Sequence, residues 1–251
     1  MDGPLTGIGV FICLVLSTLL GAAAHGRVRD MIAARGSSVI LRHILGVVAV
    51  VAAIFMTVTT LSLKVSFDTA GREVGRFSSL VIDLDRALRR VGLPSEDARE
   101  LLFRYSDRMM METWRSTGAA GLSTEPSDLL LAELDAAIGR IPTGPPDDRQ
   151  AVNEARRLLQ GVAATRWALE GRTGGSLSTA MLAGLVLLMM LTFASLGFAA
   201  PRNRLMAGML VLAALSIGGG MFLLEEYDDP FSGVIVISRE SVENALFMMT
   251  D

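Results

Sequence analysis

Three polar residues on a long apolar run of the chain have the types and spacing to contact an ion. Thr57, Thr60 and Lys64 stand at positions i, i+3 and i+7, which places them on one face of a helix. Where lipid offers no solvation, two hydroxyls and an ammonium group could line a path for anions. The alternative is that the threonines donate to carbonyls of their own helix while the lysine reaches to the membrane interface.

An acidic cluster near the C-terminus is the second candidate site. Glu225, Glu226, Asp228 and Asp229 lie within five residues, and carboxylates together with backbone carbonyls are the ligands that Ca²⁺ prefers. Their spacing matches no EF-hand loop, so the alternative is a solvated helix end. We therefore expect no cofactor, with Ca²⁺ as the one candidate ion.

Other chemistry has no support in the sequence. It contains no phosphate-binding loop, zinc-ligand spacing, nucleophile elbow or paired-histidine motif. The net charge of −3 excludes a generally basic nucleic-acid binder. We expect a protein that is not an enzyme and has no nucleic-acid partner.

The candidate sites belong to, or follow, four apolar runs that contain no Asp, Glu, Lys or Arg: residues 5–24, 44–63, 176–200 and 205–224. Each is long enough to cross the hydrocarbon core of a bilayer as a helix. The mean hydropathy of +0.47 agrees with this interpretation. The sequence thus predicts an all-α, multi-pass membrane protein with four transmembrane helices in a lipid bilayer.

The polar regions divide the chain further. We expect a first transmembrane pair in residues 1–63, a helical extramembrane region in 64–175, a second pair in 176–224 and an acidic tail in 225–251. Apolar residues at alternating spacings of three and four from Phe67 to Val91 predict that the second span continues as one long helix. Further helices are expected near Ser95, which could cap the first of them, near Ser127 and near Asp148. Residues 234–237 are the only strand candidate, and a helix that Ser241 could cap is expected after them.

The side of the membrane that each region faces stays open. The short loops at residues 25–43 and 201–204 are rich in arginine, which favours a cytoplasmic position for them and an external one for the middle region. Basic residues such as Lys64, Arg72 and Arg166 also follow or precede the spans on the other side.

Several segments resemble one family, in order along nearly the whole chain. They are Ser66-Phe67-Asp68-Thr69, Thr165-Arg166-Trp167, Ala200-Pro201-Arg202-Asn203 and Asp229-Pro230-Phe231-Ser232-Gly233. This pattern resembles the bacterial bestrophin-like membrane proteins, a family of unknown function. Its motif residues here are Pro201, Arg202, Asn203, Pro230, Phe231 and Gly233.

The resemblance implies a distant relation to bestrophins, which are pentameric, Ca²⁺-gated anion channels with a pore lined by the second membrane helix. It implies a homo-oligomer in the bacterial cytoplasmic (inner) membrane, with the helical region and both termini in the cytoplasm. Bestrophins place an acidic Ca²⁺ clasp after an Asn-Pro-Phe-Gly motif. Here the acids precede Pro230, so the chain departs from that pattern.

Two functions of different classes follow. The first is an oligomeric ion channel, with anions as the favoured ions and Thr57, Thr60 and Lys64 on its pore-lining helix. The second is a non-conducting membrane scaffold or sensor whose helical region binds a partner. The apolar stripe from Phe67 to Val91 fits both, because a helical bundle needs it in either case.

Overall fold

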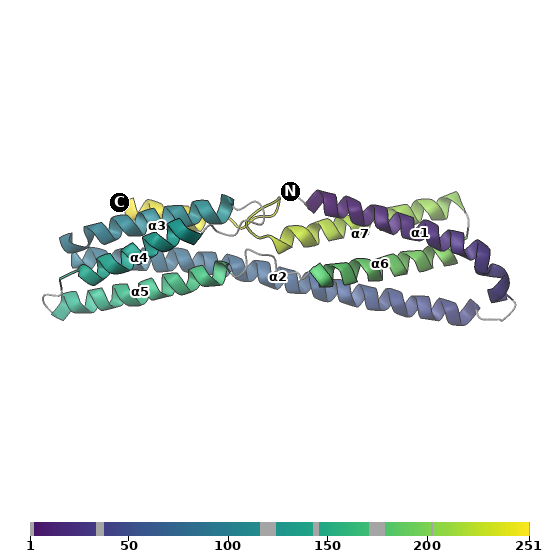
Figure 1. Cartoon of the computed structure of the whole chain (residues 1–251), viewed down its shortest axis with the longest axis horizontal. Helices are drawn as coiled ribbons and strands as arrows, with labels where there is room; N and C mark the ends of the chain where they lie inside the picture. The colour runs from purple at the N-terminus through teal and green to yellow at the C-terminus, as the bar shows by residue number, and fades with distance from the viewer. Residues whose placement is uncertain are drawn as a thin grey trace. The chain divides into compact units, whose positions relative to one another are not determined.

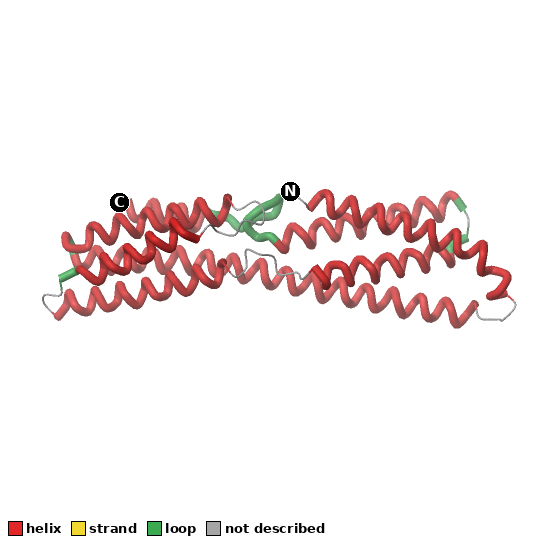
Figure 2. Tube along the Cα trace, viewed as in Figure 1, coloured by secondary structure: helices red, strands yellow, loops and turns green. Residues whose placement is uncertain are grey.

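The computed structural model describes residues 3–33, 38–115, 124–142, 146–170, 179–201 and 203–250. Within these ranges the regular structure is helical and no strand forms (Figure 2). The elements are α1 (Gly3–Ala33), α2 (Ser38–Val91), the short 3-10 helix η1 (Leu93–Ser95), α3 (Glu96–Arg115), α4 (Thr124–Arg140), α5 (Pro146–Glu170), α6 (Thr179–Ala199), α7 (Arg204–Asp228) and α8 (Glu240–Thr250). The all-α fold expected from the sequence is confirmed.

The chain divides into two compact units. Unit 1 comprises Met1–Val65 and Ser176–Asp228, and unit 2 comprises Ser66–Gly175 and Asp229–Asp251. Helix α2 contributes to both units, since no proline interrupts its 54 residues. The segment expected to be one acidic tail is divided, because α7 continues to Asp228 while α8 belongs to unit 2.

Unit 1 contains the membrane helices. Four helical stretches are long and apolar enough to cross a bilayer, in agreement with the four apolar runs: Leu5–His25, the part of α2 that begins at Gly46, Ala180–Ala199 and Arg204–Asp228. Within this unit α1 lies beside both α6 and α7 (Figure 1).

Glycines set the close approach of α1 to its two neighbours. A Cβ atom on Gly21 would lie 1.9 Å from the Ala194 carbonyl oxygen, and one on Gly197 would lie 2.1 Å from the Thr18 carbonyl oxygen. The backbones of α1 and α6 therefore touch at a point that only glycine permits, as is common between membrane helices. Helices α1 and α7 approach in a similar way at Gly7 and Gly218.

Unit 2 is a bundle around the second part of α2. The stripe predicted from Phe67 to Val91 is confirmed, and its members Val74, Phe77, Val81 and Leu84 are buried. They pack in one core with buried residues of the other helices, among them Leu102, Leu134, Ile138, Leu159, Val162 and Leu246. This burial explains why an amphipathic pattern replaces the uniform apolar one where the helix leaves unit 1.

Helix α2 ends at Val91, as predicted from the sequence. The capping role predicted for Ser95 is wrong. Gly92 takes a φ of +79°, which favours glycine and ends the helix. The buried Ser95 hydroxyl lies 2.7 Å from the carbonyl oxygens of both Leu88 and Gly92, which share its one proton. It thus stabilises the α2 terminus instead of accepting from the first turn of α3.

The strand expected at residues 234–237 does not form. The Ile237 N–H donates to the Pro230 carbonyl at 2.9 Å, and the Ile237 carbonyl accepts from the Trp114 indole at 2.8 Å. Isolated strand-forming residues need a partner strand, and these backbone groups are satisfied by a local turn and a side chain. Helix α8 then begins at Glu240, whose N–H donates to the Ser238 hydroxyl at 3.2 Å, and not at the expected Ser241.

Candidate functional site

The three candidate pore-lining residues are exposed along α2. Thr57, Thr60 and Lys64 all lie on the outside of unit 1, on one face of the helix because of their spacing. The Thr57 hydroxyl donates to the Ala53 carbonyl and the Thr60 hydroxyl to the Met56 carbonyl, both at 2.8 Å. An anion at this face would therefore have to compete with a helix carbonyl for each hydroxyl proton.

The rest of the α2 span is also uncovered by its own chain. Exposed apolar side chains surround much of it, including Ile44, Val47, Val51, Ile54, Val58 and Leu61. The face that carries Thr57 continues toward the start of the span with Val50 and Ala53, which are exposed as well. Such a surface is stable only in contact with lipid or with another protein chain.

Lys64 lies at the C-terminal end of the α2 face that carries Thr57 and Thr60, here called the threonine face. Its Nζ lies 5.9 Å from the centre of the Tyr227 ring, near the C-terminal end of α7. This is the distance range of a cation–π contact. The contact ties the ammonium group to α7 at the end of the span and keeps a positive charge beside the threonine face.

The four candidate cation ligands have separate surroundings. Glu225 accepts a 3.0 Å hydrogen bond from the Thr6 hydroxyl of α1, and Glu226 is buried. Asp228 is half-buried, and the Asp229 carboxylate accepts from the Phe231 N–H and the Ser232 hydroxyl. In the part of the chain that the structure describes, no three acidic, histidine or cysteine side chains converge as metal ligands. The Ca²⁺ site at these residues therefore stays a prediction.

The first family motif forms the turn between α6 and α7. Asn203 caps α7, since its Oδ1 accepts the Leu205 N–H at 3.2 Å, and its own N–H donates to the Pro201 carbonyl at 2.8 Å. Arg202 lies outside the described residues. These contacts give Pro201 and Asn203 a structural role in ending one span and starting the next.

The second family motif is a turn within unit 2. Pro230 and Phe231 are buried, and the Phe231 ring meets the Trp114 ring edge-on with 5.5 Å between the centres. Gly233 has a φ of +96°, a conformation that disfavours a side chain. The motif therefore fixes the path of the chain into α8 through packing and backbone geometry.

Sequence reasoning missed a buried charge cluster in unit 2. Arg166 of α5 is 1% exposed and forms ion pairs with Asp128 of α4 and, at 2.9 Å, with Glu170. Tyr105 of α3 is buried beside it. Three helices thus meet around one guanidinium group.

Both Arg166 and Tyr105 respond to this environment. Burial alone would lower the pKa of Arg166, but the carboxylates of Glu170 and Asp128 hold that pKa above its ordinary value. Burial raises the pKa of the Tyr105 phenol, against the opposing effect of Arg166. The cluster therefore keeps a charged guanidinium and a neutral phenol in the interior.

The sequence did contain a signal for this cluster. Arg166 follows Val152, Ala155, Leu159 and Val162 at the next position of their buried stripe, and Leu169 continues it. A charge on a core stripe needs a buried partner. Ser127 next to Asp128 also points inward, where its hydroxyl donates to Glu112 of α3 at 2.6 Å instead of opening α4.

Comparisons with known proteins show which family and which solved structures share this architecture. The family model of the bestrophin-like domain matches residues 10–242. A crystal structure of a bacterial bestrophin homologue from Klebsiella pneumoniae, carrying a point mutation, is 16% identical with a TM-score of 0.72 and covers 98% of this chain and 100% of its own. Another of the Klebsiella pneumoniae homologue, solved by Zn-SAD phasing, is 18% identical with a TM-score of 0.70 and covers 97% and 98%.

These structural matches show a shared fold, since their identities are low. No curated protein sequence matches the chain. The matched domain spans both units and includes α2 and most of the residues discussed above. On the evidence of that match, the chain belongs to the bestrophin-like family.

Proposed function

We propose that this membrane protein assembles with copies of itself into an anion channel of the bacterial cytoplasmic membrane, with α2 lining the pore. The observation that carries the proposal is the exposed face of Thr57, Thr60 and Lys64 on a span otherwise covered by apolar side chains. Copies of α2 facing a common axis would place this polar face toward water and the apolar faces toward lipid or neighbouring helices. Membership of a family named for anion channels supports the same direction by analogy.

The proposed conduction uses charge and hydroxyl dipoles alone. Lys64 would attract anions at one end of the span, and its ring of copies would raise their local concentration. Anions passing Thr60 and Thr57 would be stabilised by hydroxyl protons shared with the Met56 and Ala53 carbonyls. The scaffold or sensor function is retained as the alternative to be separated by experiment.

The test is ion flux through the purified full-length protein in liposomes, chloride against potassium, with and without Ca²⁺. We expect chloride flux in the wild type and at least a tenfold loss in the Thr57→Phe/Thr60→Phe double variant, whose rings would obstruct the pore. Lys64→Gln is expected to reduce the preference for chloride over potassium.

The matched control is Val58→Phe. Val58 is exposed on the same helix but lies about 100° around it from Thr57, so its flux should stay within twofold of the wild type. Light scattering of the purified protein gives the number of subunits. A folded oligomer that conducts neither ion would overturn the proposal in favour of the scaffold.

A further inference from the structure

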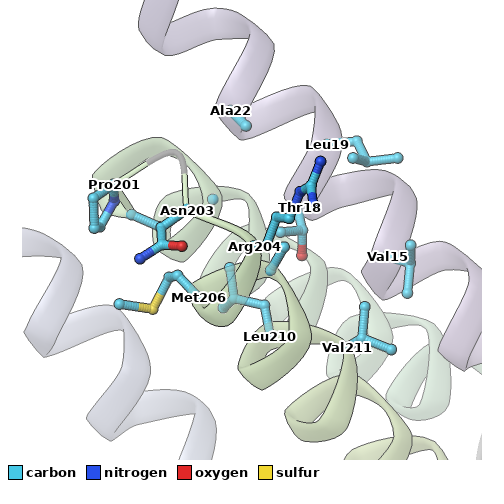
Figure 3. Close-up of a pocket in the computed structure, with 13 residues that line it drawn as sticks. Val15, Thr18, Leu19, Ala22, Pro201, Asn203, Arg204, Met206, Leu210 and Val211 are labelled. Carbon is cyan, nitrogen blue, oxygen red and sulfur yellow. The ribbon is translucent and has the colours of Figure 1, made fainter.

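A cavity of about 350 Å³ lies in unit 1 between α1 and the turn from α6 to α7. Its walls are largely apolar, with side chains from α1 and α7 that Figure 3 shows: Val15, Leu19, Met206, Leu210 and Val211. Its volume lies within the range of about 300–1,000 Å³ that is typical of ligand pockets. Leu19 and Val211 are exposed, so the cavity opens on the outside of the helices.

Small residues create the space. Gly197 and Ala200 at the end of α6, Ala22 of α1 and Ala207 of α7 all line the cavity, and none has a side chain large enough to fill it. The glycine contact between Gly21 and the Ala194 carbonyl holds α1 against α6. The side of α1 toward the start of α7 is therefore left with a gap that its own chain does not close.

Polar and basic residues also line the cavity, where the chain enters α7. They are Asn203 and Arg204, the first residue of α7. Arg204 is exposed, and no described carboxylate pairs with its guanidinium group. Two further lining residues, Thr18 and Ala22, lie near the end of the first span. The Thr18 hydroxyl donates to the Leu14 carbonyl of its own helix at 2.9 Å. The cavity thus combines an apolar body with a basic residue at the level where a span ends.

We propose that this cavity binds an anionic phospholipid, with part of an acyl chain between α1 and α7 and the headgroup phosphate at Arg204. Basic pockets between membrane helices suit anionic headgroups, because the phosphate meets a cation at the interface while the chain stays among apolar side chains. A soluble anion would leave the apolar walls uncovered. A bare lipid tail would leave Arg204 without a counter-charge, so the charge pattern selects a lipid with both parts. This site is independent of whether the chain conducts ions.

Lipid binding to the purified full-length protein in detergent tests the proposal. Phosphatidylglycerol and phosphatidylcholine with identical acyl chains are added, and the bound lipid is counted by native mass spectrometry. We expect phosphatidylglycerol to bind at least fivefold more tightly than phosphatidylcholine. Arg204→Gln should weaken phosphatidylglycerol about fivefold, the effect of one basic residue near a membrane surface. It should weaken phosphatidylcholine less, because the choline cation already offsets the charge of that lipid's phosphate.

Filling the cavity should act on both lipids. Leu210→Trp places a larger side chain in the acyl-chain region and is expected to weaken both lipids about tenfold. Ala207→Leu is a smaller filling variant that serves if the tryptophan disturbs folding. The matched controls are Leu212→Trp, an exposed residue of the same helix outside the cavity, and Arg76→Gln, an exposed arginine of unit 2. Both should bind like the wild type.

Four outcomes would overturn the proposal. Equal binding of the two lipids to the wild type would show that the net negative charge of the headgroup plays no role. Unchanged lipid binding in the folded filling variants would place the lipid elsewhere. A change in subunit number with unchanged lipid binding in Leu210→Trp would show that a second copy of the chain occupies the cavity. Inorganic phosphate is added in a separate arm, and full displacement of phosphatidylglycerol by it would mean that the acyl chain contributes nothing.

Discussion

At the scale of single residues, the interior of unit 2 depends on one buried charge. Arg166 lies among α3, α4 and α5 with its charge balanced by Asp128 and Glu170. Breaking a buried ion pair by removing one partner is costly because the other charge is left in a medium that solvates it poorly. The cluster is thus sensitive to loss of the arginine in a way that exposed pairs are not.

Arg166→Met should therefore destabilise the protein strongly. We expect the free energy of unfolding of the full-length chain in detergent to fall by about 3–5 kcal/mol, measured by urea unfolding or pulse proteolysis. Arg157→Met is the matched control on the same helix, since Arg157 pairs with Glu154 at 2.7 Å but is largely exposed. The control should remain close to the wild type. Equal effects of the two substitutions would show that the buried cluster has no special role.

At the scale of elements, α8 is attached to the bundle by three charged side chains, Asp85, Arg89 and Arg99, which we call the Asp85 clasp. Asp85 of α2 is 4% exposed and accepts from Arg89 at 2.7 Å and from Arg99 of α3 at 2.8 Å. Arg89 also donates to the carbonyls of Met248 and Met249, both at 3.1 Å. Cations at the C-terminal end of a helix satisfy its last carbonyls and complement its dipole. Asp85 thus positions the arginines that hold the end of α8.

Asp85→Ala is expected to release α8. The loss of two hydrogen bonds to charged groups should cost about 3–6 kcal/mol, and the freed arginines would no longer be held at the Met249 carbonyl. Hydrogen exchange of the amides of residues 240–250 in the full-length protein should become faster. Asp83→Ala serves as control, because Asp83 makes only an exposed 3.7 Å pair with Arg86. If exchange in α8 is unchanged in Asp85→Ala, the Asp85 clasp does not hold the helix.

The elements also show how far the sequence could predict this structure. The four spans and the continuation of α2 to Val91 follow from local patterns of apolar residues, which burial then reproduces. The predicted strand at residues 234–237 did not form, because the backbone groups of Ile237 find partners in a local turn at Pro230 and in the distant Trp114 indole. The alternation of apolar residues does not encode either contact. Ser95 and Ser127 are ordinary cap residues by type, yet tertiary contacts turn their hydroxyls to Leu88 and Glu112.

The candidate site was also predictable only where local spacing determines it. The spacing of Thr57, Thr60 and Lys64 gives a shared helix face directly, and the structure leaves that face exposed. The different surroundings of Glu225 and Asp229 depend on partners in other segments, such as Thr6 of α1. The Arg166 cluster could not be predicted from local patterns, because its members come from three helices that meet only in the folded protein.

At the scale of the whole molecule, the number of spans fixes which regions share a side of the membrane. Residues 37 and 143 are separated by one span, the apolar part of α2. The four-span topology therefore predicts that they lie on opposite sides, whichever way the chain is inserted. The arginine-rich short loops predict that residue 143 lies on the outside. The bestrophin resemblance predicts instead that residue 37 lies on the outside.

Single cysteines at these positions separate the two orientations. Ser37→Cys and Thr143→Cys, which lie outside the described residues, are made in a Cys13→Ala background because Cys13 is the one native cysteine. We expect a membrane-impermeant maleimide to label only one of the two variants in intact cells, and both after the membrane is permeabilised. Labelling of Thr143→Cys alone would mean that the short-loop arginines determine insertion. Labelling of Ser37→Cys alone would put the helical unit in the cytoplasm, and labelling of both or neither in intact cells would contradict the four-span topology itself.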